Sequence, residues 1–199
     1  DVRDIVRGYV LLLERGKIGE IYNIGSGKEI KVSELLNKLV SMSKEKIILD
    51  CDPGHDDAIA IMVAGLHEKL DLLGITVVAG NQTYENVTNN ALRICDYFGF
   101  DTHVYGGVKG PLVRKQVIAS DFHGETGLDG IKLPGTERKI EKKHAVNFIV
   151  DTLLNSEEKI TLVPVGPLTN IAMALRLEPE IKEKIKRIVL MGGSCGAGN

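Results

Sequence analysis

Residues 47–57 read IILDCDPGHDD, and this stretch is the most informative part of the sequence about the fold. Ile47, Ile48 and Leu49 form a short apolar run of the kind found in a buried strand. Pro53 and Gly54 then bend the chain, and Gly54 permits a backbone conformation that other residues resist. A helix is predicted to follow over roughly residues 56–67. The stretch therefore predicts a strand that ends in aspartates and passes directly into a helix.

The same alternation of strand and helix continues along the chain. Apolar runs predict further strands over 70–79, 103–108, 160–165 and 188–191, and helical spacing predicts helices over 85–98, 143–154, 168–177 and 179–186. Residues 106–143 are polar and glycine-rich, which predicts a functional loop with little regular structure. Because alternating strands and helices require crossover connections, we expect an α/β fold with a mostly parallel, Rossmann-like sheet and helices on both faces.

The predicted turns after these strands carry the polar residues. The aspartates follow the first strand, Asn81 follows the second, Val165-Gly166 follows the fourth, and a glycine-rich run follows the last. In such sheets ligands bind beyond the carboxyl ends of the strands, where these turns meet. The sequence therefore predicts a binding site at this edge of the sheet.

Asp50, Asp52, Asp56 and Asp57 lie within eight residues of one another. Carboxylates packed so closely repel, so they need protonation, hydrogen bonds or a cation. A hard divalent cation with oxygen ligands, Ca²⁺ or Mg²⁺, is the simplest solution, and it would lower the pKa of a bound water. The plain alternative is helix capping and solvation. A second alternative is the D-x-D-x-[TV] signature of aspartate-nucleophile phosphatases, which Gly54 at the fifth position breaks.

Composition and charge limit the classes of partner and the cellular location that we expect for the protein. A formal net charge of −2 over 199 residues favours neither nucleic acid nor an anionic membrane as a partner. No apolar run reaches the roughly 18 residues that a membrane span needs. The three cysteines are far apart and form no disulfide framework, which fits a reducing, cytoplasmic setting. The chain begins with Asp1 and no signal peptide, so cytoplasmic localisation is a default expectation.

Several blocks of the sequence resemble one family in their order and spacing. KIILDCDPGHDDA, at residues 46–58, is similar to the opening signature of the inosine–uridine-preferring nucleoside hydrolases. The blocks that follow are VAGNQT at 78–83, PLVR at 111–114, HGETG at 123–127, LVPVGPLTN at 162–170 and MGG at 191–193. The resemblance covers about residues 45–199 and corresponds to the N-terminal half of that family, which implies a truncated nucleoside hydrolase fold over residues 44–199.

This resemblance implies hydrolysis of the N-glycosidic bond of purine and pyrimidine ribonucleosides to ribose and free base, as in nucleoside salvage. It implies Ca²⁺ as the cofactor, with Asp52 both as a metal ligand and as the general base that activates a calcium-bound water. Asp57 matches a second metal ligand, Val165 a residue whose backbone carbonyl binds the metal, and Asp50 a supporting carboxylate. A small-molecule nucleoside is the implied partner, and a homo-oligomer is a further expectation.

The same resemblance implies a set of residues that contact the substrate. Asp56 matches a carboxylate that binds the ribose 2′-hydroxyl, and Asn81 matches a residue beside the ribose. Met191 matches a side chain under the sugar, Asn199 an amide on the 5′-hydroxyl, and His123 a residue on the base side of the pocket. His55 receives no role.

Two departures from the family pattern qualify this interpretation. The family supplies further metal and substrate residues after the position of Asn199, so the chain as written is expected to bind calcium and ribose weakly and to turn over slowly or not at all. The alternative function is a catalytically incomplete fragment that binds calcium or ribose. Calorimetry and a turnover assay separate the two.

Residues 1–43 form the second departure, because they do not resemble that family. Their predicted helix-strand-helix pattern resembles the C-terminal part of NDP-sugar dehydratases and epimerases of the extended short-chain dehydrogenase type. Residues 25–28, GSGK, imitate a nucleotide loop, but Tyr22, Glu29 and Ile30 break the Walker and Rossmann patterns. Two unrelated enzyme segments therefore abut near Lys44, as in a chimera, and a sugar-nucleotide enzyme fragment is a third functional hypothesis.

Overall fold

The computed structural model describes residues 45–192 of the chain. The predicted segment over residues 1–43, its resemblance to sugar-nucleotide enzymes and the predicted substrate residue Asn199 lie outside this range and stay predictions. Among the described residues, no helix is both long enough and apolar enough to cross a membrane.

The described residues build a parallel sheet with strand order β3-β2-β1-β4-β5. The strands are β1 (Glu45–Cys51), β2 (Leu70–Val77), β3 (Val104–Gly106), β4 (Ile160–Pro164) and β5 (Ile185–Ile188). The helices are α3 (His55–Leu66), α4 (Tyr84–Tyr97), α5 (Ser120–His123), α6 (Ala145–Asn155), α7 (Thr169–Leu177) and the 3₁₀ helix η1 (Pro179–Lys184). The predicted α/β class with a parallel sheet is confirmed.

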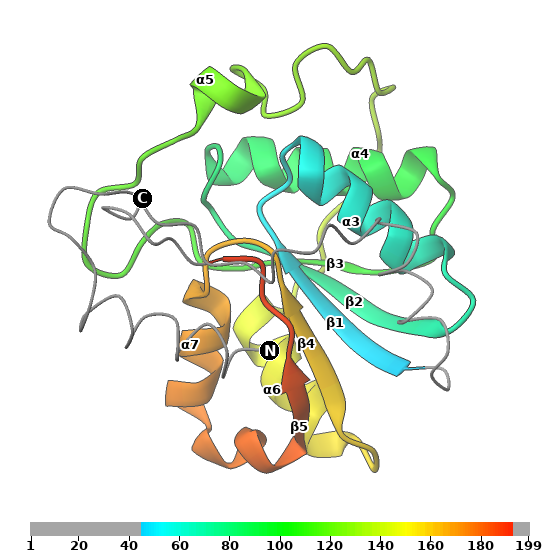
Figure 1. The fold of residues 1–199 in the computed structure, drawn as a ribbon, viewed down its shortest axis with the longest axis vertical. Coiled ribbons are helices and arrows are strands. Elements are labelled where there is room, and N and C mark those ends of the chain that lie inside the picture. Colours follow the sequence, from blue (N-terminus) through cyan, green and yellow to red (C-terminus); the bar gives the residue numbers. More distant parts are fainter. Residues whose placement is uncertain (1–44, 193–199) are drawn as a thin grey trace, which may run out of the picture. The chain divides into compact units, whose positions relative to one another are not determined.

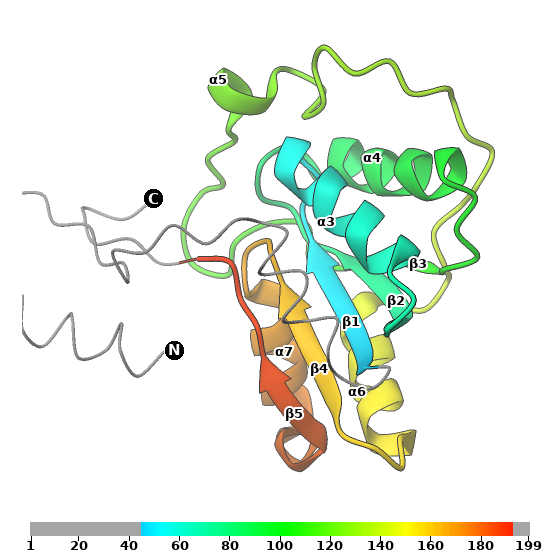
Figure 2. The ribbon, with the colours of Figure 1, turned by 45° about the vertical axis from the view of Figure 1, so that its right-hand side comes forward.

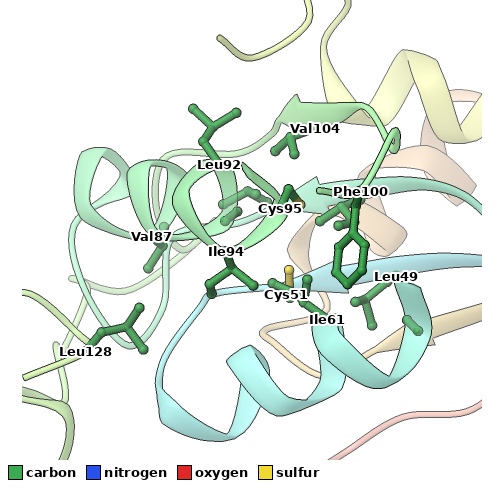
Figure 3. Packing of buried hydrophobic residues seen from close by; sticks show 14 of the residues in the cluster. Leu49, Cys51, Ile61, Val87, Leu92, Ile94, Cys95, Phe100, Val104 and Leu128 are labelled. Carbon is green, nitrogen blue, oxygen red and sulfur yellow. The ribbon is translucent and has the colours of Figure 1, made fainter. Parts of the chain in front are cut away.

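Helices cover both faces of this sheet (Figures 1 and 2). Ile47, Leu49 and Cys51 of β1 are buried in one apolar cluster with α3 and α4, which Figure 3 shows from close by. Ile48, between them in the sequence, is buried on the opposite face in a cluster with α6, α7 and η1. A strand buried on both faces cannot alternate between apolar and polar residues, which explains the continuous apolar run at its start.

The long segment between β3 and α6 has little regular structure, as its composition predicts. Within it the structure contains the four-residue helix α5 and an isolated bridge between Tyr105 and Glu141. Side chains of α4 hold its second half, since Asn86 donates to the Glu125 carbonyl and Asn90 donates to the Thr126 carbonyl. In Figure 2 this segment passes along the outer side of α4 before it reaches α6.

The boundary between the last helix and the last strand lies earlier in the chain than predicted. The sequence predicts a helix to residue 186 and a strand over 188–191, whereas η1 ends at Lys184 and β5 runs from Ile185 to Ile188. Ile185 already pairs with Ile160 of β4, so pairing with the neighbouring strand ends the helix early. The chain stays extended after β5, because Val189 N–H donates to the Leu162 carbonyl and Met191 N–H to the Pro164 carbonyl. Met191 thereby reaches the carboxyl end of β4.

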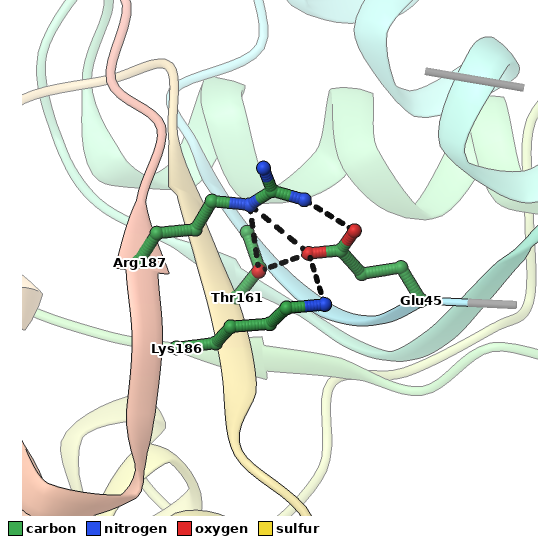
Figure 4. Close-up of polar contacts among 4 residues, drawn as sticks. All are labelled: Glu45, Thr161, Lys186 and Arg187. Carbon is green, nitrogen blue, oxygen red and sulfur yellow. Dashed lines mark hydrogen bonds and ion pairs between the residues drawn. The ribbon is translucent and has the colours of Figure 1, made fainter. Parts of the chain in front are cut away.

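Glu45 ties three strands together at the amino end of the sheet (Figure 4). Its side chain is 9% exposed, and its carboxylate accepts hydrogen bonds from Thr161 of β4 and from the Arg187 guanidinium of β5. Lys186 Nζ lies 3.6 Å from the same carboxylate. The hydrogen bond from Arg187 is the main reason that the pKa of Glu45 is below its usual value. Glu45 is therefore a fully paired structural carboxylate.

Candidate active site at the carboxyl edge of the sheet

Asp52 stands at the centre of the predicted site, directly after β1. Asn81, which follows β2, donates its backbone N–H to Asp52 Oδ2 at 2.6 Å. The Asn81 side-chain amide donates to the Asp52 carbonyl at 3.2 Å and lies 3.5 Å from Asp57 Oδ2. Two turns far apart in the sequence therefore meet at the edge where parallel strands end, as predicted.

Asp57 fixes the turn between β1 and α3. One of its carboxylate oxygens lies 3.3 Å from the Asp52 backbone nitrogen, and the other lies 3.4 Å from the Gly54 nitrogen. These free N–H groups precede the first turn of α3, where the helix dipole also favours negative charge. The alternative interpretation, helix capping, therefore explains the backbone contacts of Asp57. It does not account for Asp50 and Asp52, which lie before the helix.

Two glycines make room for the Asp52 carboxylate. A Cβ atom on Gly80 would lie 2.1 Å from Asp52 Oδ2, and one on Gly166 would lie 2.4 Å from Oδ1. A side chain at either position would therefore have to displace the Asp52 carboxylate from its present place. The turns after β2 and β4 therefore approach the Asp52 carboxylate closely with glycine backbone, and the side chain of Pro167 lies beside Gly80.

Asp50 lies behind Asp52 and is completely buried. Its Oδ1 accepts hydrogen bonds from Thr76 Oγ1 at 2.5 Å and from Asn170 Nδ2 at 2.7 Å. Its Oδ2 is buried with no hydrogen-bond partner. The Asp50 carbonyl accepts from the backbone N–H of Val165 at 2.8 Å, which places Val165 beside the aspartates. A buried carboxylate oxygen without a partner is costly and calls for a cation, a proton or water.

Burial and mutual repulsion keep these carboxyls from ionising easily. Burial raises the pKa of Asp50 to about 7, and burial together with the charge of Asp57 raises the pKa of Asp52 to about 8. Burial, with a contribution from Asp56, raises the pKa of Asp57 to about 6. Among the described residues no lysine, arginine or histidine forms an ion pair with Asp50, Asp52 or Asp57. Residues 45–192 therefore supply no cationic side chain that pairs with this cluster.

The other predicted site residues lie at differing distances from this centre. Asp56 is exposed on the first turn of α3, yet near enough to raise the pKa values of both Asp52 and Asp57. His123 packs over Gly54, where an added Cβ would lie 2.8 Å from its ring and 3.1 Å from the Asn81 side chain. Met191 is 52% exposed at the end of the segment that extends β5. The structure therefore groups Asp50, Asp52, Asp56, Asp57, Asn81, Val165 and His123, and it brings only the backbone of Met191 to the same edge.

Sequence reasoning missed several residues that support the site. Asn170 is completely buried and joins three segments, because its amide also donates to the Val77 carbonyl and accepts from the Val108 N–H. Asn170 is the last residue of the block LVPVGPLTN, which the sequence analysis identified, but no role was assigned to this residue. Thr76 has no such signal, because a threonine in a strand is ordinary. His55, to which no role was assigned, contacts His123.

The donor set fits a hard cation better than a soft one. Within residues 45–192 no three His, Cys, Asp or Glu side chains converge as a ready-made metal site. The oxygens available near Asp52 are carboxylate and backbone carbonyl oxygens, which suit Ca²⁺ or Mg²⁺, and such ions keep part of their shell as water. The unpaired Asp50 Oδ2 and the uncompensated charge of the cluster also fit a bound cation.

Comparisons with known proteins agree with this site. Residues 47–199 match the family model described as inosine-uridine preferring nucleoside hydrolase. Among curated proteins, the chain is 56% identical over 158 residues to the pyrimidine-specific ribonucleoside hydrolase RihB of Escherichia coli, covering 79% of this chain and 50% of that protein. The chain thus spans about half the length of the curated relatives that it matches.

Solved structures with the same fold carry related names. A purine-preferring ribonucleoside hydrolase from Gardnerella vaginalis superposes with a TM-score of 0.71 at 39% identity, over 75% of this chain and 49% of that one. An inosine-guanosine nucleoside hydrolase superposes with a TM-score of 0.72 at 34% identity, over 78% and 52% of the two chains. Since the family model covers most of the sequence and the blocks around Asp52, Asn81 and Val165 meet in the structure, the chain belongs to the inosine-uridine preferring nucleoside hydrolase family.

Proposed function

We propose that this chain carries the part of a ribonucleoside hydrolase active site that binds calcium and ribose. In this site Asp52 is the general base. The observation that carries the proposal is the environment of the Asp52 carboxylate. There an almost fully buried carboxylate, 4% exposed, is held by backbone groups and faces no cationic side chain in the described part of the chain. A carboxylate that only stabilised the fold would be paired, as Glu45 is.

Asp52, Asp57 and the Val165 carbonyl are the groups that would hold the metal, with Asp50 in support. When bound, Ca²⁺ supplies positive charge that holds ribose hydroxyls and lowers the pKa of water in its shell. That charge would also return the pKa of Asp52 from about 8 toward its ordinary value, so that the side chain is a carboxylate at neutral pH. Ionised Asp52 can then accept a proton from the attacking water.

The charge of the site suits cleavage of an N-glycosidic bond. The bond from C1′ to the base breaks through an oxocarbenium-like state, in which the sugar ring becomes positive. Carboxylate and amide oxygens fixed in advance favour that charge, because they need not reorganise when it develops. Asp56 and Asn81 are the proposed ribose contacts, and Met191 and Asn199 are proposed on the same resemblance. His123 is proposed on the base side.

The substrate class proposed here is ribonucleosides without a stated base preference. The relatives named above are called pyrimidine-specific in one case and purine-preferring in another, so the names do not agree on a base. Cytoplasmic location and self-association stay predictions.

Calcium binding and base release together test this proposal. The full chain, its Asp52→Asn variant and an Asp96→Asn control are compared by calorimetry with Ca²⁺ and by release of uracil or hypoxanthine from uridine or inosine. Asp96 is an exposed carboxylate on α4, so the control makes the same chemical change outside the site. We expect Asp52→Asn to weaken Ca²⁺ binding by about 100-fold or more, and any base release to need both Ca²⁺ and Asp52.

Two outcomes would contradict the proposal. One is equal Ca²⁺ affinity in the wild type and Asp52→Asn, and the other is base release that persists in excess chelator. Calcium and ribose binding without measurable base release would instead support the alternative of a binding fragment. Binding of a GDP-sugar would favour the third hypothesis, which concerns residues 1–43.

A further inference from the structure

The rings of His55 and His123 form a pair beside the aspartate cluster. Their Nδ1 atoms lie 3.2 Å apart, and the rings stack with centroids 5.4 Å apart and an interplanar angle of 26°. His55 begins α3, whereas His123 ends α5 in the long segment after β3. The pair therefore joins the first turn of the aspartate motif to the segment that is proposed to meet the nucleobase.

A third group completes the chain of contacts. His55 Nε2 lies 3.0 Å from the backbone carbonyl oxygen of Asp129. That carbonyl is held firmly, because the Asp129 N–H donates to the His123 carbonyl and the Asp129 carboxylate accepts from the backbone of Glu125 and Thr126. Gly124, with φ of +76°, leaves the space that this carboxylate fills, since a Cβ there would lie 2.0 Å from Asp129 Cγ. The acceptor for His55 is thus fixed by the turn that also carries His123.

The direction of these hydrogen bonds follows from this carbonyl and from the positions of the heavy atoms. A carbonyl oxygen only accepts, so the proton of a neutral His55 must be on Nε2. His55 Nδ1 is then an acceptor, and the proton between the two rings must come from His123 Nδ1. His123 is consequently the Nδ1–H tautomer, and its Nε2 carries a lone pair.

One contact favours the opposite arrangement. The backbone N–H of His55 also points at His123 Nδ1, at 3.4 Å, and would prefer a lone pair there. It is the longest of the three contacts. The ring contacts at 3.2 and 3.0 Å give an unbroken donor-to-acceptor chain from His123 through His55 to Asp129, and we take these to decide the tautomer.

We propose that His55 is a positioning residue: it fixes the ring and the Nδ1–H tautomer of His123, so that His123 offers the lone pair of Nε2 to the substrate. Within the described residues, His123 Nε2 has no hydrogen-bond partner, which leaves this atom available. The part of the proposal that concerns the substrate rests on the proposed function, whereas the tautomer is a property of the protein alone.

The test measures the tautomer directly by nuclear magnetic resonance. Long-range ¹H–¹⁵N spectra of the full chain, labelled with ¹⁵N-histidine, are recorded at pH about 8, where an ordinary imidazole is neutral. They are recorded for the wild type, His55→Asn and His55→Phe, and a His123→Gln sample assigns the His123 signals. The asparagine keeps an acceptor near the position of Nδ1, while the phenylalanine keeps the stacked ring and removes the acceptor.

We expect a protonated Nδ1 on His123 in the wild type and in His55→Asn. In His55→Phe the major tautomer of His123 should change to Nε2–H, because the acceptor has gone. Unchanged signals from His67, His103 and His144 would show that each variant keeps its fold. A wild-type His123 protonated on Nε2, or a His123 tautomer unaffected by His55→Phe, would overturn the proposal.

Addition of uridine and Ca²⁺ to the same samples separates this inference from the proposed function. Movement of the His123 signals in the wild type, weakened in His55→Phe, is the expected result. If nucleoside moves no signal in any sample while the tautomers behave as described, the proposed function fails at this step and the role of His55 in setting the tautomer stands. If nucleoside moves the signals equally in all three samples, His55 does not position His123 for substrate and the inference fails.

Discussion

Glu45 begins β1 and Asp52 follows its end, and both side chains are largely buried, yet their surroundings are opposite. Glu45 is held by an arginine, a lysine and a threonine, and its pKa lies below the ordinary value. Asp52 faces backbone groups and other carboxylates, and burial raises its pKa to about 8. One strand therefore carries a paired carboxylate at one end and an unpaired cluster at the other.

A structural carboxylate can be distinguished from a candidate functional one by whether a cationic side chain pairs with it. Burial costs free energy in both places, and at Glu45 the protein supplies the compensating charge itself. At Asp52 no described residue supplies such a charge, and we expect the compensation to come from protons or from a bound cation. The paired end holds strands together, whereas the unpaired end is the one for which a binding function is proposed.

The largest expected effect is a dependence of stability on pH that calcium reverses. Because folding raises the pKa values of Asp50, Asp52 and Asp57, their contribution is fully present below about pH 4 and is lost as pH rises through the folded values of about 6 to 8. At about 1.4 kcal/mol per pKa unit, the loss should reach several kcal/mol. Calcium should stabilise the protein far more at pH 8 than at pH 5, as measured by chemical unfolding with Ca²⁺ or chelator. An equal gain in stability from Ca²⁺ at pH 5 and pH 8 would contradict this prediction. It would mean that the carboxyls after β1 need no cation, so that they would not differ from Glu45 in this respect.

Asn170→Ala is expected to have the next largest effect. It removes the hydrogen bonds to Asp50 Oδ1 and to the backbone at Val77 and Val108, and it leaves buried groups unpaired. The free energy of unfolding should fall by about 2–4 kcal/mol, measured by urea unfolding. Asn155→Ala is the matched control, because that exposed amide donates only to the Asp151 carbonyl on its own helix. A loss at Asn170 no larger than at Asn155 would mean that the Asp50 network contributes little.

Glu45→Gln should be milder and should depend on pH in the opposite sense. The amide cannot replace the charge-assisted bonds to Arg187, so the variant should lose about 1–2 kcal/mol near pH 7. Because folding lowers the pKa of Glu45, its contribution is present above an unfolded pKa of about 4.3 and disappears as pH falls through the folded value. Wild type and variant should therefore converge in acid, as followed by unfolding at a series of pH values. A constant difference down to the lowest pH would show that packing, not charge, is lost.

The smallest effect is expected for Lys186→Ala. The Lys186 side chain is 44% exposed, and its nitrogen lies 3.6 Å from Glu45 Oε1, which is typical of a weak surface pair. The change in unfolding free energy should be about 0–0.5 kcal/mol and should shrink further in added salt. A loss as large as that of Glu45→Gln would mean that Lys186, not Arg187, compensates Glu45.

The sequence by itself determined the α/β class and the convergence of Asp52, Asn81 and Val165. Apolar runs report burial on both faces, and parallel strands must end at one edge, so neither conclusion needs coordinates. The tertiary structure alone decided where β5 begins, because its start depends on pairing with Ile160. It also decided which carboxylates are paired, that Asn170 supports Asp50, and that His55 contacts His123. These contacts join residues up to 142 positions apart in the chain, and local sequence pattern carries no information about which distant side chains will meet.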